Sequence, residues 1–274
     1  AGVVNRFVIL VSLPALTLDH VHRLFKVSIY PVAMAWILFF LAAVGFVTVG
    51  RALGWSRRTV GALLLCAGLG NTSFVGFPLI EALYGREALR VAILTDQPGT
   101  FLALSTVGIL AAALCAGRAV TLGGVGRRIF SFPPFLALLV ALLTRAFAYP
   151  KPLQLALHYI ALTLAPAALI SVGLQLKLKT RFLKMHRVAL SIGLIYKLLL
   201  GPALVAALYL FGLHQTGLST QVTIAEAAMA PMVTGAIVAT EYGLDAELAN
   251  LLVGVGIPLS LLTVPAWAWV LRGV

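Results

Sequence analysis

The sequence predicts an all-α polytopic membrane protein, and three properties of its 274 residues indicate this fold class. Apolar residues make up 61% of the chain and charged residues only 10%, less than half the share usual in a soluble domain. The mean hydropathy is +1.06. The apolar residues are grouped in stretches of about 20, the length that a helix needs to cross a bilayer. These properties exclude a soluble globule and a disordered chain.

Nine apolar stretches are predicted to span the membrane, joined by short polar connections. Their ranges are 3–19, 28–50, 59–84, 87–116, 129–148, 152–176, 187–212, 217–240 and 247–271. The loops after the second, fourth and sixth spans carry eleven Lys and Arg residues, and those on the opposite side carry seven. Because the side richer in cations is usually cytoplasmic, we expect the C-terminus to lie outside. We expect the basic loop over 177–187 to contact anionic membrane lipid.

The net charge of +12 does not indicate a nucleic-acid partner, because the cations lie in short runs between apolar stretches. Cys66 and Cys115 fall inside apolar segments without the spacing of metal ligands. The sequence also lacks a nucleophile elbow, a phosphate loop and a zinc motif. We therefore expect no enzyme activity, no bound metal and no cofactor.

The five histidines give only weak signals. Four are expected in solvated loops: His20, His22, His186 and His214. His158 falls inside a predicted span, where it is expected to be a packing residue.

An internal repeat is indicated by four landmarks that recur in the same order, with an offset that grows from 152 to 160 residues. The pairs are Pro14 with Pro166, Pro78 with Pro231, Tyr84 with Tyr242, and Pro98 with Pro258. Spans one to four then correspond to spans six to nine in the opposite orientation, which is typical of secondary transporters. The fifth span has no counterpart, so the simplest interpretation is a five-plus-five fold whose first helix is absent from this chain. The alternative is that these prolines align by chance.

Spans three and eight are predicted to be broken helices. The stretch GNTSFVGFPLIEALYG over 70–85 combines small and polar residues with Pro78, which is difficult to keep helical in lipid. We predict a break near Gly76, with a second half-helix that starts around Pro78. Span eight has a matching break near Pro231. The alternative is two ordinary proline kinks packed by small residues.

If the two breaks meet at the midplane, two half-helix N-termini face one cavity and favour an anion, particularly a carboxylate. Side chains near the breaks would add hydrogen bonds. The predicted substrate site comprises Asn71, Thr72, Ser73, Gly76 and Thr234, beside the crossover prolines Pro78 and Pro231.

Ionisable residues inside a membrane are costly and commonly functional. Asp96, Lys197 and Glu226 fall in the middle of predicted spans. Either carboxyl group could carry a coupling proton or help to ligate Na⁺. The alternative is a structural pair with Lys197, which could also snorkel. Gln97 is expected either to bind the same ion as Asp96 or to hold the broken backbone.

Four segments resemble the auxin efflux carrier family of membrane transporters, which includes plant auxin exporters and bacterial permeases ascribed to malonate or malate. The segments are NRFV at 5–8 followed by SLPAL at 12–16, GNTSFVGFPLIEALYG at 70–85, EAAMAPMVTGAIVATEYGLDAEL at 226–248 and PLSLLTVPAWAWVL at 258–271. The resemblance covers nearly the whole chain. It implies ten helices in two inverted repeats with crossed, broken fourth and ninth helices, as in bile-acid symporters and sodium–proton antiporters.

The resemblance also implies a mobile transport part that slides against a dimerising scaffold part. The scaffold part would comprise 1–27 and 129–178, and the transport part 28–128 and 179–274, with the helix crossover near 70–80 and 226–236. The family's crossover asparagine corresponds to Asn71, its crossover prolines to Pro78 and Pro231, and its fifth-helix polar site loosely to Asp96 and Gln97. One departure is that the family's first helix is not in this chain.

We therefore expect a secondary active transporter of a small organic anion, such as a carboxylate, a dicarboxylate or an auxin-like acid. Transport would use elevator-type alternating access, with H⁺ or Na⁺ as the coupling ion. The expected setting is a homodimer in a bacterial inner membrane. The alternatives are a sodium-coupled symporter or cation–proton antiporter of the same fold, or a sensor that binds an anion without transporting it.

Overall fold

The computed structural model describes residues 2–21, 28–117, 122–144, 146–175 and 180–274. These residues form helices joined by short connections, and no strand occurs among them. Five of the described helices are long and apolar enough to cross a membrane: Ile29–Ala52, Arg86–Ala116, Lys151–Ile170, Leu183–Gly212 and Ala246–Gly273. The prediction of an all-α polytopic membrane protein is confirmed.

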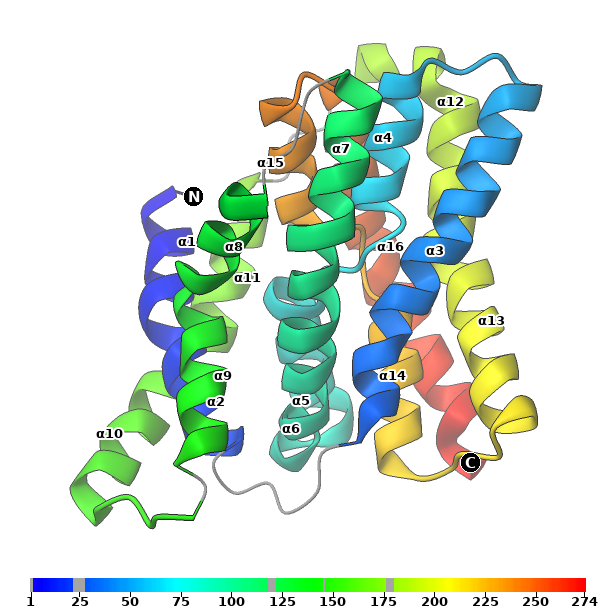
Figure 1. Cartoon of the computed structure of the whole chain (residues 1–274). Coiled ribbons are helices and arrows are strands. Elements are labelled where there is room, and N and C mark those ends of the chain that lie inside the picture. Colours follow the sequence, from blue (N-terminus) through cyan, green and yellow to red (C-terminus); the bar gives the residue numbers. More distant parts are fainter. Residues whose placement is uncertain (1, 22–27, 118–121, 145, 176–179) are drawn as a thin grey trace.

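The α-helices carry the labels of Figure 1, and η denotes a π or 3₁₀ segment. They are α1 (Gly2–Phe7), η1 (Val8–Ser12), α2 (Leu13–Val21), α3 (Ile29–Ala52), α4 (Arg57–Cys66), η2 (Thr72–Gly76), α5 (Phe77–Tyr84), η3 (Arg86–Ala88), α6 (Leu89–Leu94), η4 (Thr95–Phe101), η5 (Leu104–Gly108), α7 (Ile109–Ala116), α8 (Leu122–Phe130), α9 (Pro133–Leu143), α10 (Lys151–Leu162), α11 (Leu164–Gln175), α12 (Thr180–Ile195), η6 (Tyr196–Leu200), α13 (Gly201–Ala206), η7 (Ala207–Gly212), α14 (Leu218–Ala227), α15 (Val233–Glu241), α16 (Ala246–Val270) and η8 (Leu271–Gly273).

Two of the predicted spans are interrupted by unwound backbone, as the sequence indicated. Between α14 and α15 the chain leaves the helix over 228–232, which confirms the break predicted near Pro231. Between α4 and η2 it is unwound over 67–71, so the prediction of a break near Gly76 is wrong. Pro78 is the second residue of α5, but α5 continues directly from η2, so Pro78 lies inside a helical segment that begins at Thr72. The first break instead falls at Gly68 and Gly70, residues that weaken a helix.

The predicted fifth span, 129–148, is not one continuous helix. α8 ends at Phe130, and α9 begins only at Pro133. Two consecutive prolines occupy the first positions of α9, where they favour the start of a new helix over the continuation of the preceding one. The 11 residues of α9 give a length of about 16 Å, about half of a bilayer's apolar core.

Figure 1 shows how the helices are arranged. α1, α2 and α8 to α11 lie together on the left, and α3, α12, α13, α14 and α16 on the right. α4 to α7 and α15 occupy the middle. The left group contains the described segments predicted to form the scaffold part, and that division stays a prediction. Of the two broken helices, α4, α5 and α15 lie between the two groups and α14 lies with the right group, and the unwound residues 67–71 and 228–232 are buried in protein.

Candidate functional site

The two unwound segments cross in direct contact and satisfy each other's backbone groups. The Asn71 N–H donates to the Ala230 carbonyl oxygen at 2.8 Å, and the Met232 N–H donates to the Cys66 carbonyl oxygen at 2.9 Å. Gly70 and Pro231 form an isolated antiparallel bridge between these bonds. Because lipid offers no hydrogen bonds, non-helical backbone at membrane depth requires such partners. The hydrogen bonds at the crossing therefore allow both helices to stay broken without exposing unpaired backbone groups to lipid.

Small residues allow the close approach at the crossing. A Cβ built on Gly235 would collide with the Leu65 carbonyl oxygen at the end of α4. A Cβ built on Gly256 of α16 would collide with the ring of Pro231. Glycine is thus required where α15 and α16 pack onto the crossing backbones.

The half-helices that follow the breaks direct their positive N-terminal ends towards the crossing. The Asn71 side chain caps the first of them, because its Oδ1 accepts a hydrogen bond from the Phe74 N–H at 3.2 Å. Asn71 Nδ2 is buried and has no hydrogen-bond partner among the described residues. At the second, the N-cap residue Met232 makes no side-chain hydrogen bond. This end of the site therefore offers N–H groups, as an anion would require.

Lys197 lies at the opposite side of the crossing, beside the last carbonyl groups of α14. Its side chain comes from η6, is only 1% exposed, and donates from Nζ to the Ala227 carbonyl oxygen at 2.8 Å. Nζ would also lie 3.0 Å from a Cβ built on Gly70. A cation beside the last carbonyls of a helix is stabilised by the helix dipole. The Lys197 amine therefore lies buried at the centre of the crossing instead of snorkelling to the surface.

Glu226 lies one residue before the end of α14 and is fully buried. Its carboxyl group faces Gly76, since a Cβ built there would lie 2.7 Å from Oε2. Neither carboxyl oxygen has a hydrogen-bond partner among the described residues. An ionised carboxylate without partners is very costly in an apolar interior, and a bound proton removes most of that cost. Glu226 therefore places a carboxyl group without a hydrogen-bond partner among the described residues in the interior of the protein.

Asp96 reaches the same region from η4. Its Oδ1 accepts a hydrogen bond from Thr72 Oγ1 at 2.6 Å, and Ser73 is the second hydroxyl residue that faces the carboxylate. Asp96 and Lys197 are the charged neighbours of Glu226. The structure thus brings together side chains from η2, η4, η6 and α14: Thr72, Ser73, Asp96, Lys197 and Glu226.

Two predicted site residues have other surroundings. Gln97 is fully buried, but its Nε2 donates to Thr17 Oγ1 at 2.7 Å and so joins η4 to α2. Thr234 is half-buried on the first turn of α15. Sequence reasoning missed Thr17, because a single threonine in an apolar span gives no sign of a partner 80 residues away.

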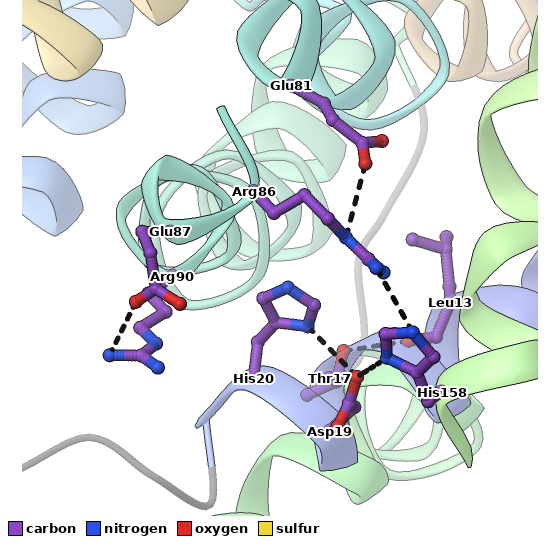
Figure 2. A network of polar contacts seen from close by, with 9 residues as sticks. All are labelled: Leu13, Thr17, Asp19, His20, Glu81, Arg86, Glu87, Arg90 and His158. Carbon is purple, nitrogen blue, oxygen red and sulfur yellow. Dashed lines mark hydrogen bonds and ion pairs between the residues drawn. The ribbon is translucent and has the colours of Figure 1, made fainter. Parts of the chain in front are cut away.

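A second polar cluster lies where α2, α10 and η3 meet (Figure 2). His20 was expected in a solvated loop, and this is wrong: it is 8% exposed, because α2 continues to Val21 and buries it. His158, expected to be a packing residue, bonds Arg86 and Asp19. The cluster borders a cavity of about 130 Å³ lined by Asp19, His20, Arg86, Glu87, Arg90 and His158. His22 lies outside the described residues.

Comparison with known proteins supplies independent evidence of kinship. A family described as membrane transport protein matches residues 1–121 and 118–268. A protein named as an uncharacterized transporter from Methanothermobacter thermautotrophicus is 30% identical over 281 residues, which cover 99% of this chain and 89% of that protein. The uncharacterized transporter MJ1031 from Methanocaldococcus jannaschii is 23% identical over 282 residues, covering 99% and 90% of the two chains.

Proposed function

The chain belongs to the membrane transport protein family of the auxin efflux carrier type, and from that premise we propose that it is a secondary active transporter of a small organic anion bearing a carboxylate. It is an integral membrane protein. The observation that carries the proposal is the crossing of two unwound segments beside buried ionisable side chains. This arrangement places substrate and coupling sites between two inverted halves in other transporters.

The proposed substrate site lies at the N-terminal ends of the half-helices. The buried Asn71 amide has a free donor there, and the first N–H groups of η2 and α15 add partial positive charge. A carboxylate would pair with these donors. In this conformation the Thr72 hydroxyl donates a hydrogen bond to Asp96. A bound anion would either compete with Asp96 for this hydroxyl or leave the bond unchanged.

The proposed coupling site is the pair Glu226 and Asp96. Protonation of Glu226 would remove a buried negative charge beside Asp96 and leave Lys197 as the dominant charge at the crossing. A proton would thereby alter the relative stability of the two access states, which is what coupling requires. The same carboxyl oxygens suit Na⁺, so a sodium-coupled symporter is the second candidate.

The proposed movement is of the elevator type, in which the transport part slides against the scaffold part. The bond between Gln97 on η4 and Thr17 on α2 joins the two parts in the present state. A sliding movement would break this bond and form others.

Ligand binding to the purified chain tests the proposed substrate class. Thermal unfolding would be followed with a panel of mono- and dicarboxylates at pH 5.5 and 7.5, with and without Na⁺. A bound ligand raises the unfolding temperature by an amount that grows with its concentration relative to its Kd. We expect stabilisation by one class of carboxylate that is lost in Asn71→Ala and kept in Asn250→Ala, a matched change at an exposed position of α16. Stabilisation by Na⁺ alone, with none by any acid, would favour a cation transporter.

Uptake into liposomes tests the coupling role of Glu226. In Glu226→Gln, the carboxyl is replaced by an amide of the same shape that does not titrate. We expect the wild-type pH dependence of uptake to be abolished in this variant while its unfolding temperature stays at or above that of the wild type. A variant that keeps the wild-type pH profile would eliminate Glu226 as the proton carrier. Binding without uptake by the wild-type chain would favour the sensor.

A further inference from the structure

The polar cluster at the lower end of the molecule in Figure 1 is a chain of contacts that joins three separate elements (Figure 2). Arg86, at the start of η3, places Nη1 3.2 Å from His158 Nε2 on α10. His158 Nδ1 lies 3.3 Å from Asp19 Oδ2 on α2. We call these three residues the Asp19–His158–Arg86 network. Asp19 and His158 lie in the proposed scaffold part, and Arg86 lies in the proposed transport part.

The donors and acceptors of this network fix one state of the imidazole. A guanidinium has only donors, so His158 Nε2 must accept from Arg86. A carboxylate has only acceptors, so His158 Nδ1 must carry the proton that it donates to Asp19. Both bonds form together only when His158 is neutral and protonated at Nδ1.

Protonation of His158 breaks one of these bonds and keeps the other. A proton on Nε2 removes the acceptor for Arg86 and places two cations within contact distance. The bond from Nδ1 to Asp19 becomes an ion pair, which strengthens it. Arg86 retains a second partner, because its Nε lies 3.3 Å from Glu81 Oε1 on α5. Each side thus keeps a carboxylate when the contact between them opens, so opening leaves no buried charge unpaired.

We propose that the Asp19–His158–Arg86 network is a proton-sensitive contact that holds the scaffold and transport parts in the present arrangement at neutral pH and releases them on acidification. This inference rests on the proposed function, since it assigns a control to the same sliding movement. Histidine is the side chain that proteins commonly use as a switch within the physiological pH range.

The other charged groups around His158 do not change the direction of this response, which is release of the contact on acidification. On α2, His20 Nδ1 lies 3.8 Å from Asp19 Oδ2 and faces the same carboxylate. Across the cavity, Glu87 is paired with Arg90 at 2.9 Å. Lys151 and Tyr159 lie on α10 itself, with the Tyr159 ring edge-on to the imidazole, and Tyr84 ends α5. Among them, His158 is the imidazole that bonds residues of both parts.

The distance between the two parts provides a test that needs no substrate. Spin labels would be attached at Leu155→Cys on α10 and Leu83→Cys on α5, both exposed positions, in the purified full chain carrying Cys115→Ser. The native Cys66 is fully buried and inaccessible to the label. Pulsed electron–electron double resonance would then give the distribution of distances between the two spin labels at pH 8 and pH 5. We expect one dominant distance at pH 8 and a second distance at pH 5, with the ratio of the two changed about tenfold.

Variants of His158 separate the proposed mechanism from a general effect of acid. His158→Gln offers an acceptor and a donor but does not titrate, so we expect the pH 8 distance at both pH values. His158→Arg and Arg86→Met remove the contact from either side, so we expect the second distance at both. His214→Asn, a change at an exposed histidine with a φ of 51°, is the control and should respond as the wild type does.

The proposal is overturned if His158→Gln keeps the wild-type response, or if the wild-type distances are the same at pH 8 and pH 5. Unfolding temperatures identify any variant that fails to fold. If one of the contact-breaking variants, His158→Arg or Arg86→Met, does not fold, the other still tests the proposal. Failure of the proposed function would look different. The distances would still depend on pH and on His158, while no carboxylate was bound or taken up.

Discussion

The buried polar side chains around the crossing depend on one another across separate elements. Asp96 on η4 is held by the Thr72 hydroxyl of η2, although 24 residues separate them in the chain. Asp96 is 5% exposed and Thr72 is 1% exposed, so water does not replace the bond if it is lost. A buried acceptor that loses its donor keeps the full penalty of its desolvation. Thr72 is therefore important both for stability and for the state of Asp96.

Thr72→Val removes this donor while keeping nearly the same shape. We expect it to destabilise the protein by about 1.5–3 kcal/mol, the usual range for a hydrogen bond to a charged group. The measurement is the unfolding temperature of the detergent-purified chain. Thr72→Ser keeps the hydroxyl and should retain most of the stability. Equal stability of the valine variant and the wild type would show that the Thr72 bond does not support Asp96.

The sequence identified Asp96, Lys197 and Glu226 from one physical rule, the cost of charge inside a membrane. That rule does not predict which groups these side chains bond. It left open whether Lys197 pairs with a carboxylate or snorkels, whereas the structure gives it the Ala227 carbonyl oxygen. Gln97 likewise bonds Thr17, which neither sequence expectation included. Partners far apart in the chain depend on helix packing, which a single sequence does not encode in any local pattern.

At the scale of elements, the two breaks differ in how well the sequence located them. Pro231 lies inside its own unwound segment, so the proline predicted the break correctly. Pro78 lies inside the continuous helical segment that η2 and α5 form, so it does not mark the break, and it misled the prediction. The first break is fixed by backbone bonds between Cys66 and Met232 and between Asn71 and Ala230, which require the second segment to be present.

Gly235→Ala tests how closely α15 must pack on the end of α4. The added Cβ would collide with the Leu65 carbonyl oxygen, and a backbone atom has little freedom to move away. Overpacking of this kind costs about 1–3 kcal/mol and occasionally more, and we expect the upper end of that range. The check is again the unfolding temperature.

Gly45→Ala is the matched control for that change. Gly45 lies inside α3, and no atom lies within 4 Å of a Cβ built there. Alanine should therefore be neutral or stabilise the helix by up to about 1 kcal/mol. If Gly235→Ala were tolerated equally well, the close approach of α15 and α4 would not be a requirement of the fold.

For the whole molecule, hydropathy predicted the class and most of the helical segments, because lipid imposes the same length on every spanning helix. It was less informative where protein, not lipid, surrounds the chain. The predicted span 129–148 covers the end of α8 and all of α9, since prolines 133 and 134 begin a new helix in an otherwise apolar run. The cluster around His158 was not predicted either, because its members come from four elements, α2, η3, α6 and α10, and show no common spacing.

The orientation of the molecule is a prediction that belongs to this scale. The side predicted to be cytoplasmic carries eleven cations in its loops and the other side seven, a difference that should be sufficient to set the topology. Ala52, the last residue of α3, is exposed on the cation-rich side, and Thr216, before α14, is exposed on the other. Single cysteines at these positions, with Cys115→Ser, would be treated with a membrane-impermeant maleimide in intact cells. We expect Thr216→Cys to be labelled directly and Ala52→Cys only after permeabilisation. The reverse pattern would place the Asp19–His158–Arg86 network on the cytoplasmic side, so the proton that acts on it would come from inside the cell.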